Sequence, residues 1–200
     1  MLSVTLPEIP LVWLVAVGSA LAIGGVGGHF GYRFWKERRA RRTVETIFRS
    51  VSLDLLTDVL VPDDMGGTVH MDALLKTTNA IVVIDLRDIA GLIFGSEQMT
   101  EWAVMQKNWR YTFANPLGPL HERLSVVRSL VGEHVTVEGL VVFTDRGSFP
   151  KGYPPLVARL SSLEAALSGI TAITGTETQL DAAWASVQAV ASKSPILRRY

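Results

Sequence analysis

The sequence has no cysteine and no net charge, and each absence excludes a class of protein. Without cysteine, the fold cannot rest on disulfide bonds or on thiolate metal sites. The 19 Lys plus Arg residues are balanced by 19 Asp plus Glu residues, so there is no overall basic surface for a polyanion. There is also no internal repeat and no low-complexity tract, which excludes repeat architectures. At 200 residues and 48% hydrophobic content, the chain can form one ordinary core plus an accessory segment.

Ionisable side chains are missing altogether from the segment Ile9–Gly28. At a rise of about 1.5 Å per residue, an apolar helix of roughly 20 residues crosses the ~30 Å hydrocarbon layer. No Lys or Arg precedes this segment, and Glu8 does, whereas a cleaved signal peptide begins with positive charge. We therefore predict a short tail over residues 1–8 and a transmembrane helix over residues 9–32.

Positive charge follows the predicted span. The linker of residues 33–42 holds a single acid, Glu37, and six basic residues: Arg33, Lys36, Arg38, Arg39, Arg41 and Arg42. The positive-inside rule puts this flank in the cytoplasm, so the expected location is the inner (cytoplasmic) membrane, with the N-terminus outside. Glycines four apart in the span, Gly24 with Gly28 and Gly27 with Gly31, allow close approach of a second copy, although glycine-rich spans also exist alone.

Residues 43–200 keep 13 basic and 17 acidic residues, a formal charge of −4, and alternate between two hydrophobic periods. Apolar residues three and four apart predict a first helix over Arg41–Leu56, and the period changes to that of strands after Asp58. The fold class is therefore α+β, with an antiparallel meander flanked by helices. The expected strands are 58–61, 68–76, 81–88, 91–94, 101–105, 111–113 and 135–143, and the later helices are 120–131, 160–167 and 180–191. We expect one domain over residues 43–170 and a C-terminal helical extension over residues 171–200.

The strands over 68–76 and 81–88 are close enough to form a hairpin. A loop of two or of four residues gives the same register, in which the numbers of facing residues add to 157. Asp72 then faces Asp85 and His70 faces Arg87, and strand alternation puts all four side chains on one face of the sheet.

Facing carboxylates repel each other by a few tenths to about 1 kcal/mol. Two arrangements offset this cost. A divalent cation can bind both carboxylates, as Mg²⁺ does in many phosphate-handling sites. Alternatively, Arg87 and His70 neutralise the acids on a solvated sheet. The residue pattern leaves both arrangements open.

Several segments in a fixed order resemble the nuclease-related domain, or NERD, family over about residues 44–167. The segments are Val59-Leu60-Val61-Pro62-Asp63-Asp64-Met65-Gly66-Gly67, Met71-Asp72, Val83-Ile84-Asp85-Leu86-Arg87, Gly91-Leu92-Ile93-Phe94-Gly95-Ser96-Glu97 with Trp102, Phe113-Ala114-Asn115-Pro116-Leu117, and Val141-Val142-Phe143.

The resemblance implies a PD-(D/E)xK, or restriction-endonuclease-like, core. In that fold a lone Asp on one strand and an acid-x-Lys on the next bind metal and activate water. By position, Asp72 is the lone acid, Asp85 is the second acid, Arg87 stands in place of the lysine, and Glu45 matches an acid on the first helix. The resemblance thus implies Mg²⁺ or Mn²⁺ held by Asp72, Asp85 and Glu45, and hydrolysis of DNA or RNA phosphodiesters.

The sequence departs from the family pattern at two positions of the implied site, so a second function stays open as the alternative. Asp85 is one methylene shorter than the usual Glu, and Arg87 stays protonated and cannot act as a base. The alternative is a catalytically inactive binding or scaffold domain in a membrane assembly, such as DNA-transfer or envelope machinery. Trp102, Trp109 and Tyr111 likewise allow two interpretations, packing on the sheet or stacking on nucleic-acid bases.

Overall fold

The computed structural model describes residues 43–170 and 176–194. The chain divides into two compact units, residues 1–44 and 45–200, and nearly all described residues belong to the second. The predicted transmembrane helix and basic linker lie outside the described residues. Among the helices formed by the described part of the chain, none is long and apolar enough to cross a membrane.

The first described helix covers residues 43–50 and is shorter than predicted. The expected extension to Leu56 is wrong, because β1 begins at Asp54. Two serine hydroxyls explain where the helix ends, since each donates to a carbonyl of the last turn: Ser50 Oγ to Ile47 O at 2.8 Å and Ser52 Oγ to Phe48 O at 2.8 Å. Phe48 is 2% exposed and fixes this helix to the core.

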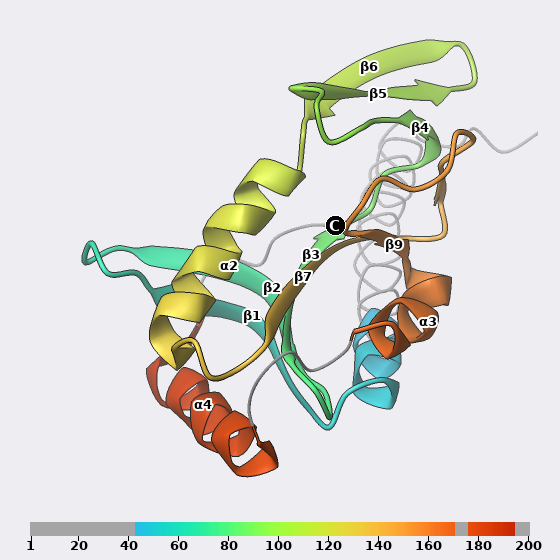
Figure 1. Cartoon of the computed structure of the whole chain (residues 1–200). Helices are drawn as coiled ribbons and strands as arrows, with labels where there is room; N and C mark the ends of the chain where they lie inside the picture. The colour runs from blue at the N-terminus through green and yellow to red at the C-terminus, as the bar shows by residue number, and fades with distance from the viewer. Residues whose placement is uncertain (1–42, 171–175, 195–200) are drawn as a thin grey trace, which may run out of the picture. The chain divides into compact units, whose positions relative to one another are not determined.

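The larger of two sheets has the strand order β10-β1-β2-β3-β7-β9. Its strands are β1 (Asp54–Pro62), β2 (Thr68–Lys76), β3 (Ile81–Arg87), β7 (Val137–Phe143), β9 (Val157–Arg159) and β10 (Ser192–Lys193). The first three form the predicted antiparallel meander. β7 then pairs in parallel with β3, and β9 in parallel with β7 (Figure 1).

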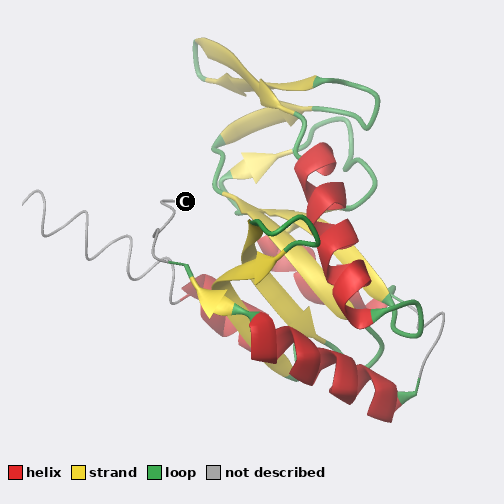
Figure 2. Cartoon of the chain, turned by 90° about the vertical axis from the view of Figure 1, so that its left-hand side faces the viewer, coloured by secondary structure: helices red, strands yellow, loops and turns green. Residues whose placement is uncertain are grey.

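The second sheet has the order β6-β5-β4-β8. Its strands are β4 (Gly91–Phe94), β5 (Glu101–Gln106), β6 (Trp109–Ala114) and β8 (Gly147–Ser148). The predicted turn at Lys107 and Asn108 joins β5 to β6. The β5–β6 hairpin projects from the end of the larger sheet beyond β4 (Figures 1 and 2).

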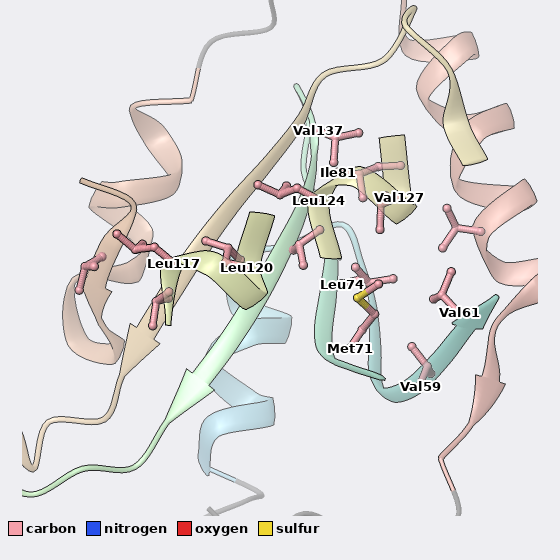
Figure 3. Packing of buried hydrophobic residues seen from close by; sticks show 14 of the residues in the cluster. Val59, Val61, Met71, Leu74, Ile81, Leu117, Leu120, Leu124, Val127 and Val137 are labelled. Carbon is pink, nitrogen blue, oxygen red and sulfur yellow. The ribbon is translucent and has the colours of Figure 1, made fainter. Parts of the chain in front are cut away.

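Helix α2 (Leu117–Val131) makes the crossover from the second sheet to β7, and it covers one face of the larger sheet. The 3-10 turn η1 (Leu160–Ser162) and helix α3 (Leu163–Ser168) lie on the other side (Figure 1). Apolar residues three and four apart turn α2 toward β3 and β7 (Figure 3). They are Leu117, Leu120, Leu124 and Val127.

Helix α4 (Glu177–Val190) belongs to the core, which corrects the expectation of a C-terminal extension beyond it. Trp184 is 3% exposed, and its Nε1 donates to Asp54 Oδ2 in β1 at 2.8 Å. Leu180 and Val187 join the same hydrophobic cluster as α2. The chain then continues into β10, which pairs with β1 at the edge of the larger sheet. The sequence did not predict this role, because α4 is rich in alanine and its buried stripe is narrow.

Candidate functional site: a buried cluster of carboxylates and guanidiniums

The β2–β3 hairpin has the predicted register. Its paired residues run from Ala73 opposite Ile84 to Lys76 opposite Ile81. The ladder stops at Ala73, one residue before Asp72 and Asp85 would face each other. The two carboxylates therefore lie where the paired part of the hairpin ends.

Asp72 has a side chain that is 3% exposed. Its Oδ2 accepts a hydrogen bond from the backbone N–H of Leu86 at 3.0 Å. Burial raises the pKa of Asp72 above its ordinary value, and the neighbouring charge of Asp85 raises it further. Asp72 thus accepts a hydrogen bond from the backbone of β3, although burial disfavours its charged form.

Asp85 is bound by two arginines through one oxygen. Its Oδ2 accepts from Arg87 Nη2 at 2.8 Å and from Arg123 Nη1 at 2.9 Å. The Asp85 side chain is 1% exposed and that of Arg123 is 8% exposed, whereas Arg87 is 32% exposed. Arg123 is also held by its Nε, which donates to the carbonyl of His70 at 2.8 Å. The second predicted metal ligand is therefore already paired with a fixed cation.

His70 does not pair with Arg87, and that part of the register prediction is wrong because the β2–β3 ladder has already ended. His70 Nε2 instead lies 2.7 Å from Asp58 Oδ1 in β1, and its Nδ1 lies 3.5 Å from Asp72 Oδ1. Asp58 has a positive φ of 57° and interrupts the β1–β2 ladder across from Asp72. Three carboxylates thus share this region with two guanidiniums and one imidazole.

Glu45, the third acid of the implied metal site, lies on the first helix and is 44% exposed. It binds Arg49 one turn along, at 2.8 Å to Nη2 and 3.1 Å to Nε. It makes no polar contact with Asp72 or Asp85. Its proposed role as a metal ligand stays a prediction.

Sequence reasoning missed Arg123 and Asp58. Arg123 could have been found, because it falls between Leu120 and Leu124 on the apolar stripe of α2, where an arginine needs a buried partner. Asp58 gives no such signal, since its contact with His70 depends on the pairing of β1 with β2. Arg123 is the more important omission because it changes the charge of the site.

The cluster, as it is arranged, does not fit a divalent metal. The described residues contain no group of three or more His, Cys, Asp or Glu side chains placed to hold one. A metal bound to Asp85 would also lie beside two guanidiniums. At an effective dielectric constant of about 20, one unit charge opposes a divalent ion ~4 Å away by roughly 8 kcal/mol. A divalent ion at Asp85 would therefore compete with Arg87 and Arg123 for this carboxylate.

This geometry defines the class of the protein: a mixed α+β fold with paired acids on adjacent strands of its meander. The family model "Nuclease-related domain" matches residues 33–144, more than half of the chain. The chain therefore belongs to the nuclease-related domain family. The match includes β1 to β7 and every residue of the cluster. No curated protein and no solved structure matches the chain significantly.

Proposed function

We propose that this protein is a membrane-anchored, catalytically inactive member of the nuclease-related family that works as a binding or scaffold domain. The observation that supports this proposal is the pairing of Asp85 with Arg123. An internal guanidinium supplies the positive charge that a metal would otherwise supply. The carboxylates then accept structural hydrogen bonds instead of activating water.

The proposed core is of the restriction-endonuclease-like type. A meander of three antiparallel strands, a crossover helix and a strand parallel to β3 follow each other in the order expected for that fold. The acids lie on the second and third strands, where the resemblance puts a metal site. Beside these acids, α2 contributes a buried arginine, Arg123.

The proposed anchor is the segment of residues 9–32, with the basic linker of residues 33–42 on the cytoplasmic side. Its support is the uncharged run of the sequence and the excess of basic residues after it. Protease treatment of intact spheroplasts tests this topology. A C-terminal tag should be protected and an N-terminal tag removed, and the opposite pattern would contradict the proposal.

Metal-dependent hydrolysis of nucleic acid is the second candidate function. It is favoured by one observation, the location of Asp72 and Asp85 side by side at the end of the hairpin. In that case Mg²⁺ or Mn²⁺ would be held by these acids with Glu45, and would lower the pKa of a bound water.

A cleavage assay separates the two functions. Full-length protein in detergent micelles is incubated with plasmid, single-stranded DNA and RNA, in Mg²⁺ or Mn²⁺. We expect no cleavage above that of an Asp72→Ala control. We also expect none from Arg87→Lys, because Arg123 still neutralises Asp85. Cleavage by the wild-type protein that disappears in Asp72→Ala would establish the hydrolase.

A further inference from the structure

Aromatic side chains on β6 run from the core into solvent. Phe113 packs edge-on against Trp102, with ring centroids 5.9 Å apart, and Trp102 is fully buried. Tyr111 and Trp109 follow at alternate positions, so they lie on the same face of the strand. Tyr111 is 43% exposed and Trp109 is 79% exposed. Trp102 is therefore a packing residue, whereas the other two rings are available to a ligand.

Two cations lie on this hairpin, and only one of them can share the side of the rings. Lys107 occupies the β5–β6 turn with a positive φ of 53°, whereas Arg110 lies between the rings in sequence, so strand alternation puts it on the opposite face of β6. Neither forms an ion pair or side-chain hydrogen bond with another described residue. β6 is also the edge strand of its sheet, and no described strand pairs with its outer side. Positive charge, exposed rings and an open edge thus coincide on one hairpin of an otherwise acidic domain.

The spacing and charge fit single-stranded nucleic acid. Alternate residues on a strand lie about 6.6 Å apart, close to twice the ~3.4 Å separation of stacked bases. An unpaired base can stack on each ring, and Lys107 at the turn can contact a phosphate. A duplex offers no free base faces inside the helix. The hydrocarbon core of a bilayer fits less well, because Gln106, Lys107 and Asn108 form a polar tip that is costly to bury.

We infer that the β5–β6 hairpin is a binding surface for single-stranded nucleic acid, with Trp109 and Tyr111 stacking on bases and Lys107 contacting a phosphate. The surface includes no residue of the acid cluster. Its existence is therefore independent of whether that cluster is inactive. It names a ligand class for the binding domain without assigning a reaction to it.

The test uses full-length protein in detergent micelles with EDTA, so that metal-dependent cleavage does not contribute. Anisotropy of a fluorescein-labelled oligothymidylate of about 20 nucleotides measures binding. Trp109→Ala and Tyr111→Ala should each weaken binding about 10-fold, whereas Trp109→Phe keeps a stacking ring and should stay close to wild type. Leu53→Ala removes an apolar side chain that is 64% exposed and lies outside the hairpin, and it should have no effect.

Salt dependence gives a second readout. Lys107→Gln should reduce the slope of log K against log salt by about 0.7, because it removes one phosphate contact. Trp109→Ala should leave that slope unchanged. Lys193→Gln, in exposed β10 of the other sheet, is the matched control and should change neither affinity nor slope.

Three results would overturn the inference. One is the absence of oligothymidylate binding, or binding that survives both alanine substitutions. Another is equal affinity for a duplex, or a loss in Trp109→Ala of binding to anionic vesicles but not of binding to oligothymidylate. The third is a change of oligomeric state in Trp109→Ala by light scattering, which would make the open edge a contact between copies. Cleavage is measured separately, so a failure here is distinguishable from a failure of the proposed inactivity.

Discussion

Replacing Arg123 with Met should cost about 3–5 kcal/mol of unfolding free energy. The change removes the 2.9 Å bond to Asp85 and the 2.8 Å bond to the carbonyl of His70. Asp85, whose side chain is 1% exposed, then keeps only the partly solvated Arg87. Removing one partner of a buried ion pair costs this much because the other charge stays buried.

Chemical and thermal unfolding of the full-length protein in micelles, followed by tryptophan fluorescence, measures the loss. For a domain of this size the melting temperature should fall by about 10 °C or more. Arg128→Met is the control on the same helix, because Arg128 is exposed and binds only a carbonyl, that of Val137, at 2.8 Å. It should cost about 1 kcal/mol or less.

A double-mutant cycle decides whether the pair itself carries the effect. Asp85→Asn combined with Arg123→Met should be more stable than the sum of the single changes predicts, by about 2 kcal/mol. Arg87 can turn to solvent once Asp85 is neutral. Additive single changes, or a cost below about 1 kcal/mol for Arg123→Met, would refute the reasoning that Arg123 compensates a buried charge.

Other predictions concern charge at the site, attachment of α4 and packing of the second sheet. Burial raises the pKa of Asp72, so the stability that the protonated carboxyl contributes is lost as the pH rises above 3.8, the ordinary pKa of an Asp side chain. Asp72→Asn should remove that loss in unfolding curves measured from acid to neutral pH. Trp184→Phe removes the hydrogen bond that lowers the pKa of Asp54, so it should cost about 1–2 kcal/mol of unfolding free energy near neutral pH. The cost should be smaller in acid, because protonation of Asp54 weakens the same hydrogen bond in the wild-type protein. Gly95→Ala puts a Cβ 2.2 Å from Trp102 Cδ2, and because that indole is fully buried, the change should cost about 1–3 kcal/mol by thermal unfolding.

Local patterns in the sequence were enough to predict the meander, its register and the position of α2. Two features make this possible. The short loop between β2 and β3 restricts their pairing, and the stripe from Leu120 to Val127 has the period of a helix. The family resemblance, which the family model confirms, depends on the same segments.

Contacts between distant segments could not be predicted in this way. Pairing of Asp85 with Arg123 spans 38 residues, and attachment of α4 to Asp54 by Trp184 spans 130. Each depends on how α2 and α4 pack against the sheet, which hydrophobic periodicity does not determine. The charge balance of the site is a property of this packing, so sequence reasoning found the acids and missed the buried cation that binds Asp85.

Binding of Mn²⁺ to the full-length protein tests the central claim most directly, because it does not depend on choosing the correct nucleic-acid substrate. Free and bound Mn²⁺ are distinguished by electron paramagnetic resonance near neutral pH, in wild type and in Asp72→Ala and Asp85→Ala variants. If Arg123 neutralises Asp85, the three proteins should bind Mn²⁺ equally weakly. A wild-type site that is lost in both alanine variants would contradict the account.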